Sequence, residues 1–290
     1  MTPDHPVTLS QLRSPVLVAA FEGWNDAGEA ATGAVEHLEL FWNAEQACEI
    51  TPDDYYDFQV SRPTVHLIDG VSRRLEWPTT TFSYCSPPGA DHDLVLVKGI
   101  EPNFRWRAFV AEIAEIAEIA GVTSAVMLGS MMADVPHTRP VSISGSAHSS
   151  EAAKQYRLAE SRYQGPTGIT GVLQDGLVAA GIPSVSLWAA VPHYLSSSPN
   201  PKATLALLRR LEDVLDLEIP MDQLPERAAA WERTVDEMTS DDEDMAEYIR
   251  QLEENDDAAA TDPETLPEID GEQLAADFER YLRRRNPDAG

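Results

Sequence analysis

The chain has 290 residues, of which 43% are hydrophobic and 24% are charged, a composition typical of globular proteins. Its formal net charge of -28 disfavours binding to nucleic acids or anionic membranes, because both need clusters of Lys and Arg. The length exceeds one average domain, so we expect one large core with an appendage, and proteins or small molecules as partners.

Cysteine usage and the N-terminal sequence indicate a cytoplasmic protein. Cys48 and Cys85 are too few for a disulfide framework, and neither belongs to a CxxC pair. The first residues lack the basic start and apolar run of a signal peptide, and no apolar stretch is long enough to cross a membrane. We therefore expect a protein of the reducing cytosol.

Short apolar runs alternate with helical patterns, which is typical of βα units that build a mostly parallel sheet. In chain order, the pattern predicts a strand at residues 15–21, a helix at 25–42, antiparallel or edge strands at 64–84, a strand at 93–99, a helix after it, a strand at 123–130, helices at 149–158 and 168–180, a strand at 182–191 and a helix at 202–216. In the helix after residue 99, Ile113, Ile116 and Ile119 are expected to face the sheet.

The C-terminal part of the chain carries most of the unusual charge. Residues 222–290 hold 22 Asp and Glu against 7 Arg, a net charge of -15. We therefore predict a core domain at residues 10–221 and an acidic helical extension at residues 222–290. Within the extension, helices are predicted at residues 238–257 and 271–285, with a linker between them. In the first helix, the apolar side chains of Met245, Tyr248, Ile249 and Leu252 form one face that could dock.

Four polar loops follow the predicted parallel strands, and ligands collect at the carboxyl ends of strands in such sheets. The first loop is Glu-Gly-Trp-Asn-Asp-Ala-Gly at residues 22–28, where Asn25 or Asp26 would cap the next helix. It matches no phosphate-binding motif. Asn25 and Asp26 are ligand-binding candidates, and a purely structural turn is the alternative.

The second loop, residues 99–106, contributes Glu101, Asn103 and Arg105 as candidates. Glu101 and Asn103 suit the start of a helix, and Arg105 could pair with a carboxylate from a neighbouring loop. A structural ion pair is the alternative to a ligand site.

The third loop, residues 129–140, has the densest group of polar residues. Its candidates are Ser130, Asp134, His137, Thr138 and Arg139. Arg139 could bind a carboxylate or phosphate, with His137 as a general acid or base oriented by Asp134. The same loop could instead be a rigid element at a subunit interface.

The fourth region combines residues 163–171 with residues 191–194 and contributes Thr167 and His193. Three glycines allow close backbone approach before a helix, so the Thr167 hydroxyl and nearby amides form a possible anion site. Hydrolase and metalloprotease motifs are absent, and the histidines are too scattered for a metal site. We predict neither a metal nor a cofactor, and the residues alone assign no catalytic role.

Five motifs in order resemble the bacterial branch of the proteasome assembly chaperone 2 family. They are GWNDAG at 23–28, KGIEPNFRW at 98–106, DVPHTRP at 134–140, YQGPTGITG at 163–171 and PHYLSSSPNPKA at 192–203. The resemblance covers about residues 10–220. It implies a three-layer α/β/α sandwich similar to the phosphorylase/hydrolase-like fold, and eukaryotic and archaeal relatives that act as chaperones on proteasome α subunits.

Two functional hypotheses follow. The first is a non-enzymatic, homo-oligomeric assembly or chaperone-like scaffold whose acidic extension and apolar stripes dock proteins. The second is a small-molecule enzyme of the phosphorylase or hydrolase kind, with His137, Arg139 and Thr167 in one pocket that takes a small anionic ligand.

Overall fold

The structure is a computed structural model that describes residues 9–158, 164–195, 199–240 and 242–261. No helix within these ranges is long and apolar enough to cross a membrane. The helix predicted at residues 271–285, and most of the linker before it, lie outside the described residues.

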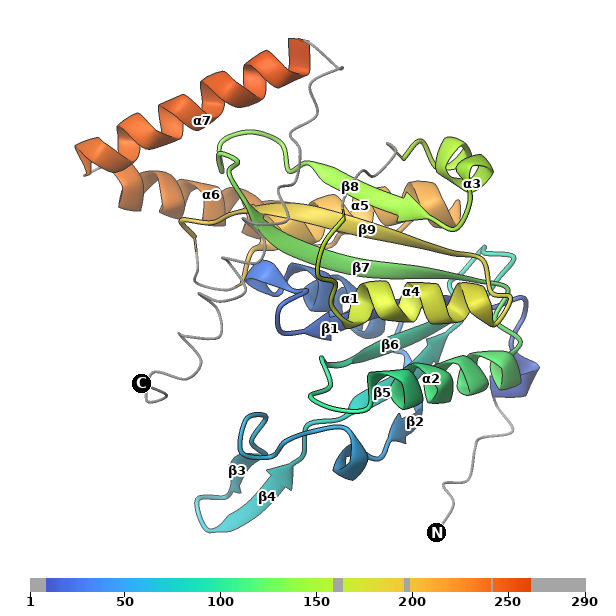
Figure 1. The fold of residues 1–290 in the computed structure, drawn as a ribbon. Helices are drawn as coiled ribbons and strands as arrows, with labels where there is room; N and C mark the ends of the chain where they lie inside the picture. Colours follow the sequence, from blue (N-terminus) through green and yellow to red (C-terminus); the bar gives the residue numbers. More distant parts are fainter. Residues whose placement is uncertain (1–8, 159–163, 196–198, 241, 262–290) are drawn as a thin grey trace. The chain divides into compact units, whose positions relative to one another are not determined.

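Seven strands form one mixed, mostly parallel sheet, and two more form a separate hairpin (Figure 1). The strands are β1 (Val16–Glu22), β2 (Glu45–Ile50), β3 (Thr64–Ile68), β4 (Ser72–Glu76), β5 (Thr80–Cys85), β6 (Leu94–Ile100), β7 (Ser124–Ala133), β8 (Ile143–Ala147) and β9 (Ser184–Pro192). The order in the large sheet is β2-β5-β6-β1-β7-β9-β8. Strand β1 runs parallel to β6 and β7, whereas β5 runs antiparallel to β6 and β2.

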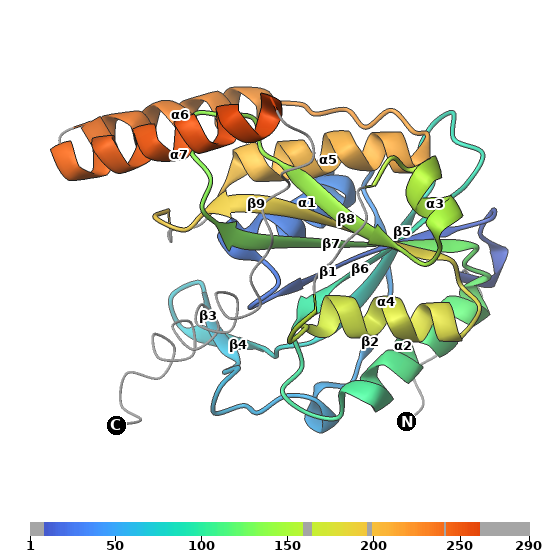
Figure 2. The same ribbon diagram turned by 45° about the horizontal axis from the view of Figure 1, so that its top comes forward.

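Helices lie on both faces of this sheet, which confirms the predicted α/β class and the α/β/α layers (Figures 1 and 2). The α-helices are α1 (Ala30–Phe41), α2 (Trp106–Ala120), α3 (Ser150–Gln155), α4 (Ile169–Ala179), α5 (Pro201–Leu215), α6 (Leu224–Ser240) and α7 (Glu243–Thr261). Short 3₁₀ turns occur at η1 (Leu9–Gln11), η2 (Ala27–Glu29) and η3 (Pro52–Asp54). The chain divides into two compact units: residues 1–23, 35–128 and 169–186 form the first, and residues 24–34, 129–168 and 187–290 form the second.

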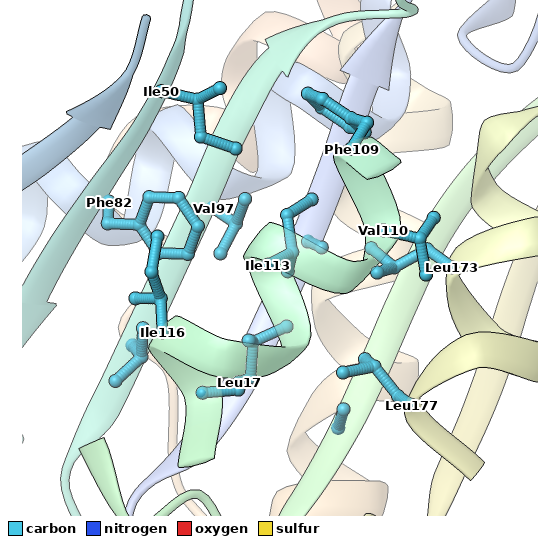
Figure 3. Close-up of a cluster of buried hydrophobic side chains, with 14 of the residues drawn as sticks. Leu17, Ile50, Phe82, Val97, Phe109, Val110, Ile113, Ile116, Leu173 and Leu177 are labelled. Carbon is cyan, nitrogen blue, oxygen red and sulfur yellow. The ribbon is translucent and has the colours of Figure 1, made fainter. Parts of the chain in front are cut away.

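The core of the first unit contains side chains from α2, α4 and the strands (Figure 3). Phe21 and Phe109 pack edge to face, with ring centroids 5.9 Å apart. Ile113 and Ile116 are buried, as the periodicity predicts, but Ile119 is 45% exposed. The prediction for Ile119 was wrong, because each three-residue step turns an α-helix about 60° short of a full rotation, and two steps move the side chain off the buried face.

Residues 64–84 do form antiparallel strands, as predicted. Strands β3 and β4 pair as a hairpin, and β5 lies inside the large sheet between β2 and β6, not at an edge. The sequence patterns missed β2 and β8, which lack a continuous apolar run.

In the second unit, α6 packs on α5, and α7 packs on α6 (Figure 2). A single helix was predicted at residues 238–257, but Met238 lies near the end of α6, and α7 begins at Glu243. The apolar face predicted for this helix is present, and Ile249 and Leu252 are buried within the chain itself. The division into a core at residues 10–221 and an extension at 222–290 stays a prediction.

Candidate functional site

The structure distributes the twelve candidate residues over both units. The second unit holds nine of them: Asn25, Asp26, Ser130, Asp134, His137, Thr138, Arg139, Thr167 and His193. The first unit holds Glu101, Asn103 and Arg105. The candidates of each unit therefore form separate sets.

In the second unit, the loop after β1 caps helix α1. The Asp26 carboxylate accepts hydrogen bonds from the amides of Ala31 and Thr32, at 2.7 and 3.3 Å, and from the Thr32 hydroxyl. The Ser130 hydroxyl donates to the Ala27 carbonyl at 2.8 Å and lies 3.3 Å from Asp26 Oδ1. Burial raises the pKa of Asp26, although these hydrogen bonds favour its ionised form. The predicted helix cap at Asp26 is confirmed, and both carboxylate oxygens are used within the protein.

Asn25 joins the first, third and fourth loops. Its side chain is buried, and its backbone carbonyl accepts a hydrogen bond from the Ser130 amide at 2.8 Å. A β-carbon at Gly168 would lie 2.1 Å from Asn25 Oδ1, so this close approach requires glycine. The neighbouring Thr167 is exposed.

The backbone amide and both ring nitrogens of His137 have hydrogen-bond partners. The Tyr194 hydroxyl accepts from the His137 amide at 2.8 Å and lies 2.8 Å from ring Nδ1, while Nε2 lies 2.9 Å from Asp236 Oδ1 on α6. Because the hydroxyl accepts from the amide, its proton is available for Nδ1, and Nε2–H then donates to Asp236. Burial raises the pKa of Tyr194 to about 12, which keeps its hydroxyl protonated.

The sequence predicted that Asp134 orients His137, but the structure places Asp134 beside His193 instead. Asp134 Oδ1 is 3.0 Å from His193 Nδ1, and the Tyr248 hydroxyl of α7 lies 3.5 Å from His193 Nε2. The rings of His193 and Tyr248 pack edge to face, with centroids 5.6 Å apart. Burial, together with Asp134, raises the pKa of Tyr248.

Thr138 and Arg139 bind carboxylates of α7. The Arg139 guanidinium donates from Nε and Nη2 to the two carboxylate oxygens of Asp257, at 3.0 and 2.9 Å, and lies 3.4 Å from Glu253. The Thr138 hydroxyl donates to Glu253. The hydrogen bond from Arg139 lowers the pKa of Asp257. We call these contacts between residues 134–139 and 193–194 and helices α6 and α7 the loop–tail contact.

A small cavity lies within the loop–tail contact. Its lining includes His137, Arg139, Lys202, Trp231 and Asp256. Its volume of about 10 Å³ is enough for roughly one water molecule.

In the first unit, Glu101 and Asn103 stabilise backbone segments. The Glu101 carboxylate accepts from the first amide of α4 at 2.8 Å, and Asn103 Oδ1 accepts from the Asp57 amide at 2.8 Å. Both side chains therefore satisfy amide donors that have no strand partner.

Arg105 forms the ion pair that the sequence predicted as one alternative. Its guanidinium lies 2.5 Å from Asp54 and 5.9 Å from the centroid of the Tyr55 ring. The backbone of Arg105 is left-handed, with φ at 56°, immediately before α2. The side chain thus links η3 to the start of α2.

The family model of the PAC2 family matches residues 20–239 of the chain. The chain belongs to the PAC2 family. This confirms the resemblance that the five motifs had suggested. A comparison with curated proteins returned no match.

Several solved structures share this fold. The proteasome-assembly chaperone homologue Rv2125 of Mycobacterium tuberculosis is 55% identical, with a TM-score of 0.76, and the match covers 81% of this chain and 99% of that one. A PAC2 family protein of Streptomyces avermitilis is 53% identical, with the same TM-score and coverage. PbaB of Pyrococcus furiosus, an archaeal proteasome activator, shares the fold at 18% identity, with a TM-score of 0.63 over 79% of this chain and 94% of that one.

Several residues of the loop–tail contact in this PAC2 protein were not among the site residues predicted from the sequence. Asp236, Glu253 and Asp257 are partners of the third loop, yet the sequence treated them only as part of a solvated acidic extension. Tyr194, which bonds to His137, stands next to the candidate His193. A signal was present, because a basic and histidine-containing loop and an acidic helix are electrostatic complements.

Among the described residues, no group of three or more His, Cys, Asp and Glu side chains is placed to hold a metal ion. The arrangement is that of a polar interface: its histidines, its arginine and its tyrosines are paired with groups of the same chain.

Proposed function

We propose that the protein is a non-enzymatic, oligomeric scaffold with a chaperone-like role in assembling other proteins in the cytoplasm. The observation that carries this proposal is the loop–tail contact. In it, the histidine and arginine that an active site would present to a substrate are bonded to the protein's own helices.

His137 lacks the geometry of a general base. A general base needs a ring nitrogen within hydrogen-bond reach of the substrate proton. Both ring nitrogens of His137 already have partners, Tyr194 and Asp236, and the side chain is only 1% exposed. This supports a structural role in which His137 anchors α6.

The guanidinium group of Arg139 likewise already has hydrogen-bond partners within the chain. A free guanidinium fork binds a phosphate or carboxylate through two parallel hydrogen bonds. Here the Asp257 carboxylate accepts both bonds, so a small anion would have to displace α7. The adjacent cavity of about 10 Å³ is also far below the several hundred Å³ of ordinary ligand pockets. Both observations disfavour the phosphorylase or hydrolase hypothesis.

Family membership supports the choice of partner. The relative at 55% identity is described as a proteasome-assembly chaperone homologue. We therefore propose proteins as partners, with proteasome subunits as the first clients to test, and other copies of this chain as a second kind of partner. Cys48 and Cys85 are buried free thiols, which fits a reducing compartment.

The test is the assembly of purified proteasome subunits from the same organism, with and without the full chain. We expect a complex with a subunit on native gels and faster appearance of peptidase-active particles. An unrelated acidic protein at equal concentration controls for charge and crowding. Assembly that proceeds at the same rate, with no complex to any subunit, would show that proteasome subunits are not the clients.

The non-enzymatic part of the proposal has its own test. Turnover of a phosphorylated or ester small molecule by the purified chain, abolished in His137→Gln, would contradict it. We expect no such turnover, and we expect His137→Gln to affect only the protection of α6 in hydrogen exchange.

A further inference from the structure

The two helices of the loop–tail contact are not held equally firmly. Helix α6 packs on α5 and buries Leu224, Ala228 and Val235. Helix α7 has 19 residues, yet among its described side chains only Ile249 and Leu252 are buried. Burial of apolar side chains supplies most of the stability of a helix in a folded protein. Helix α7 is therefore the more easily released of the two.

Carboxylates in the second half of α7 make the polar contacts with the third loop. Glu253 accepts a hydrogen bond from the Thr138 hydroxyl, and Asp257 accepts both bonds of the Arg139 guanidinium fork. A guanidinium fork binds the carboxylate of a separate ligand in the same way. The side chains of Asp257 and Arg139 are 62% and 32% exposed, so a competing carboxylate can reach this pair.

Aromatic side chains hold the first half of α7. The Tyr248 hydroxyl lies 3.5 Å from Nε2 of His193. The Tyr248 ring packs edge to face against the rings of His193 and Tyr194, with centroids 5.6 and 6.2 Å apart. We call the surface formed by Thr138, Arg139, His193 and Tyr194 the α7 seat. It recognises an amphipathic helix by an aromatic residue at one end and by carboxylates at the other.

The α7 seat lies within the family match, and α7 lies beyond it. The match covers residues 20–239, which include all four residues of the seat, and it ends before α7 begins at Glu243. The segment between β7 and β8, which supplies part of the seat, lies beside α6 and α7 (Figures 1 and 2). A surface that the family domain supplies is thus covered by a helix outside that domain.

We propose that the α7 seat is a binding site for an acidic amphipathic helix of a partner protein, and that α7 occupies it as an intramolecular competitor. This inference rests on the proposed function and deepens it, since it names the chemistry of the client segment. The client helix carries two carboxylates one turn apart and an apolar pair on the turn before them, as α7 does.

Covalent attachment gives α7 an advantage over a client helix. Helix α6 ends at Ser240 and α7 begins at Glu243, so the connection is short. A segment on so short a connection has an effective concentration on the order of millimolar at its site. The apparent affinity of a client falls in proportion to the fraction of molecules whose seat is free. Weakening α7 in the chain should therefore strengthen the binding of a helix that is added separately.

The first test measures the binding of two labelled peptides to the full chain by fluorescence anisotropy. One peptide has the sequence of residues 243–261, and the other keeps only its aromatic, apolar and seat-facing carboxylate positions. Leu252→Ala removes a buried side chain of α7, so we expect this variant to bind both peptides at least about tenfold more tightly than the parent. Gln251→Ala, at an exposed position of α7, is the matched control and should bind them as the parent does.

The second test places the peptides on the seat. In the Leu252→Ala chain, the further change Arg139→Ala should lower the affinity for both peptides a few-fold. Lys154→Ala removes an equal charge at an exposed position of α3 and should leave the affinity unchanged. A peptide with Gln and Asn in place of Glu253 and Asp257 should bind more weakly and should not respond to Arg139→Ala, as a double-mutant cycle requires.

The melting temperature of each variant separates release of α7 from loss of the fold. We expect all variants to melt close to the parent, because α7 lies at the edge of its unit. Equal peptide affinity in the parent, Leu252→Ala and Gln251→Ala would overturn the proposal, as would binding that does not respond to Arg139→Ala. Binding of the 243–261 peptide alone would also overturn it, because the seat would then accept only its own helix.

The two proposals fail in different experiments. If both peptides bind as expected and the chain leaves proteasome assembly unchanged, the α7 seat stands and proteasome subunits are not the clients. If the chain accelerates assembly but neither peptide binds the Leu252→Ala variant, the assembly role stands and the α7 seat is wrong.

Discussion

Asp93 illustrates how one buried carboxylate fixes the start of a strand. The residue is only 3% exposed and immediately precedes β6. Its oxygens accept from the Arg13 amide at 2.7 Å and from the Arg13 guanidinium at 2.6 and 3.1 Å. Burial alone would raise the pKa of Asp93, but the bonds from Arg13 outweigh burial and lower it below the ordinary 3.8.

Asp93→Asn should therefore lower the free energy of unfolding at neutral pH by about 1–3 kcal/mol, because a charged hydrogen-bond network loses its charge. A carboxyl whose folded pKa is lowered stabilises the protein above its unfolded pKa and loses this effect as pH falls through the folded pKa. The difference between variant and parent should thus shrink below about pH 4 in urea titrations. Asp91→Asn, at an exposed neighbour, is the control, and an equal loss in both variants would contradict the prediction.

Local contacts between residues could be predicted, and distant ones could not. The Asp26 cap uses amides five and six residues later, whereas the ion pair expected as one alternative for Arg105 forms with Asp54, a distant partner that the sequence did not identify. The partner of His137 is Asp236, 99 residues away. A sequence without aligned homologues does not say which of many acidic residues meets a given histidine, because that depends on how α6 packs.

Among the helices, α7 is held in place by its buried apolar face and by two carboxylates beside that face. Ile249 and Leu252 are buried, while Glu253 and Asp257 bind Arg139. The apolar contact supplies most of the stabilisation, since exposed ion pairs contribute little. The ion pair instead fixes where the end of α7 lies.

Arg139→Ala should loosen α7 without unfolding the protein. We expect a few-fold faster hydrogen exchange across α7 and little change in melting temperature. Since the hydrogen bond from Arg139 lowers the pKa of Asp257, the parent should lose this protection as pH falls through that lowered pKa, and the variant should not respond.

Arg250→Ala is the matched control for Arg139→Ala. Arg250 lies on α7 itself, and its ion pair is with Glu247, one turn away at 2.5 Å. We expect it to leave the exchange of α7 close to the parent. If both variants change exchange equally, the loop–tail contact does not hold α7.

The parallel strands that the sequence predicted share one property. Strands β1, β6, β7 and β9 carry continuous apolar runs because helices cover both faces of the sheet. Strand β8 reads Ile-Ser-Gly-Ser-Ala and is half-buried, so no apolar period marks it. Helix α6 was missed because its buried residues are few, and the break before α7 falls within a run of acidic residues.

For the molecule as a whole, the net charge of -28 opposes self-association, whereas exposed apolar side chains, such as those of the β3–β4 hairpin, favour it. The range of the repulsion depends on salt, because the Debye length falls from about 30 Å at 0.01 M to about 8 Å at 0.15 M. Burial of apolar side chains is far less sensitive to salt over this range.

Self-association should therefore become stronger, not weaker, as sodium chloride rises from about 0.01 to about 0.15 M, since salt screens the repulsion and leaves the apolar contact. Sedimentation equilibrium at several protein concentrations measures the dissociation constant directly. Association that weakens with salt would mean that ion pairs, and not apolar contacts, hold the copies together.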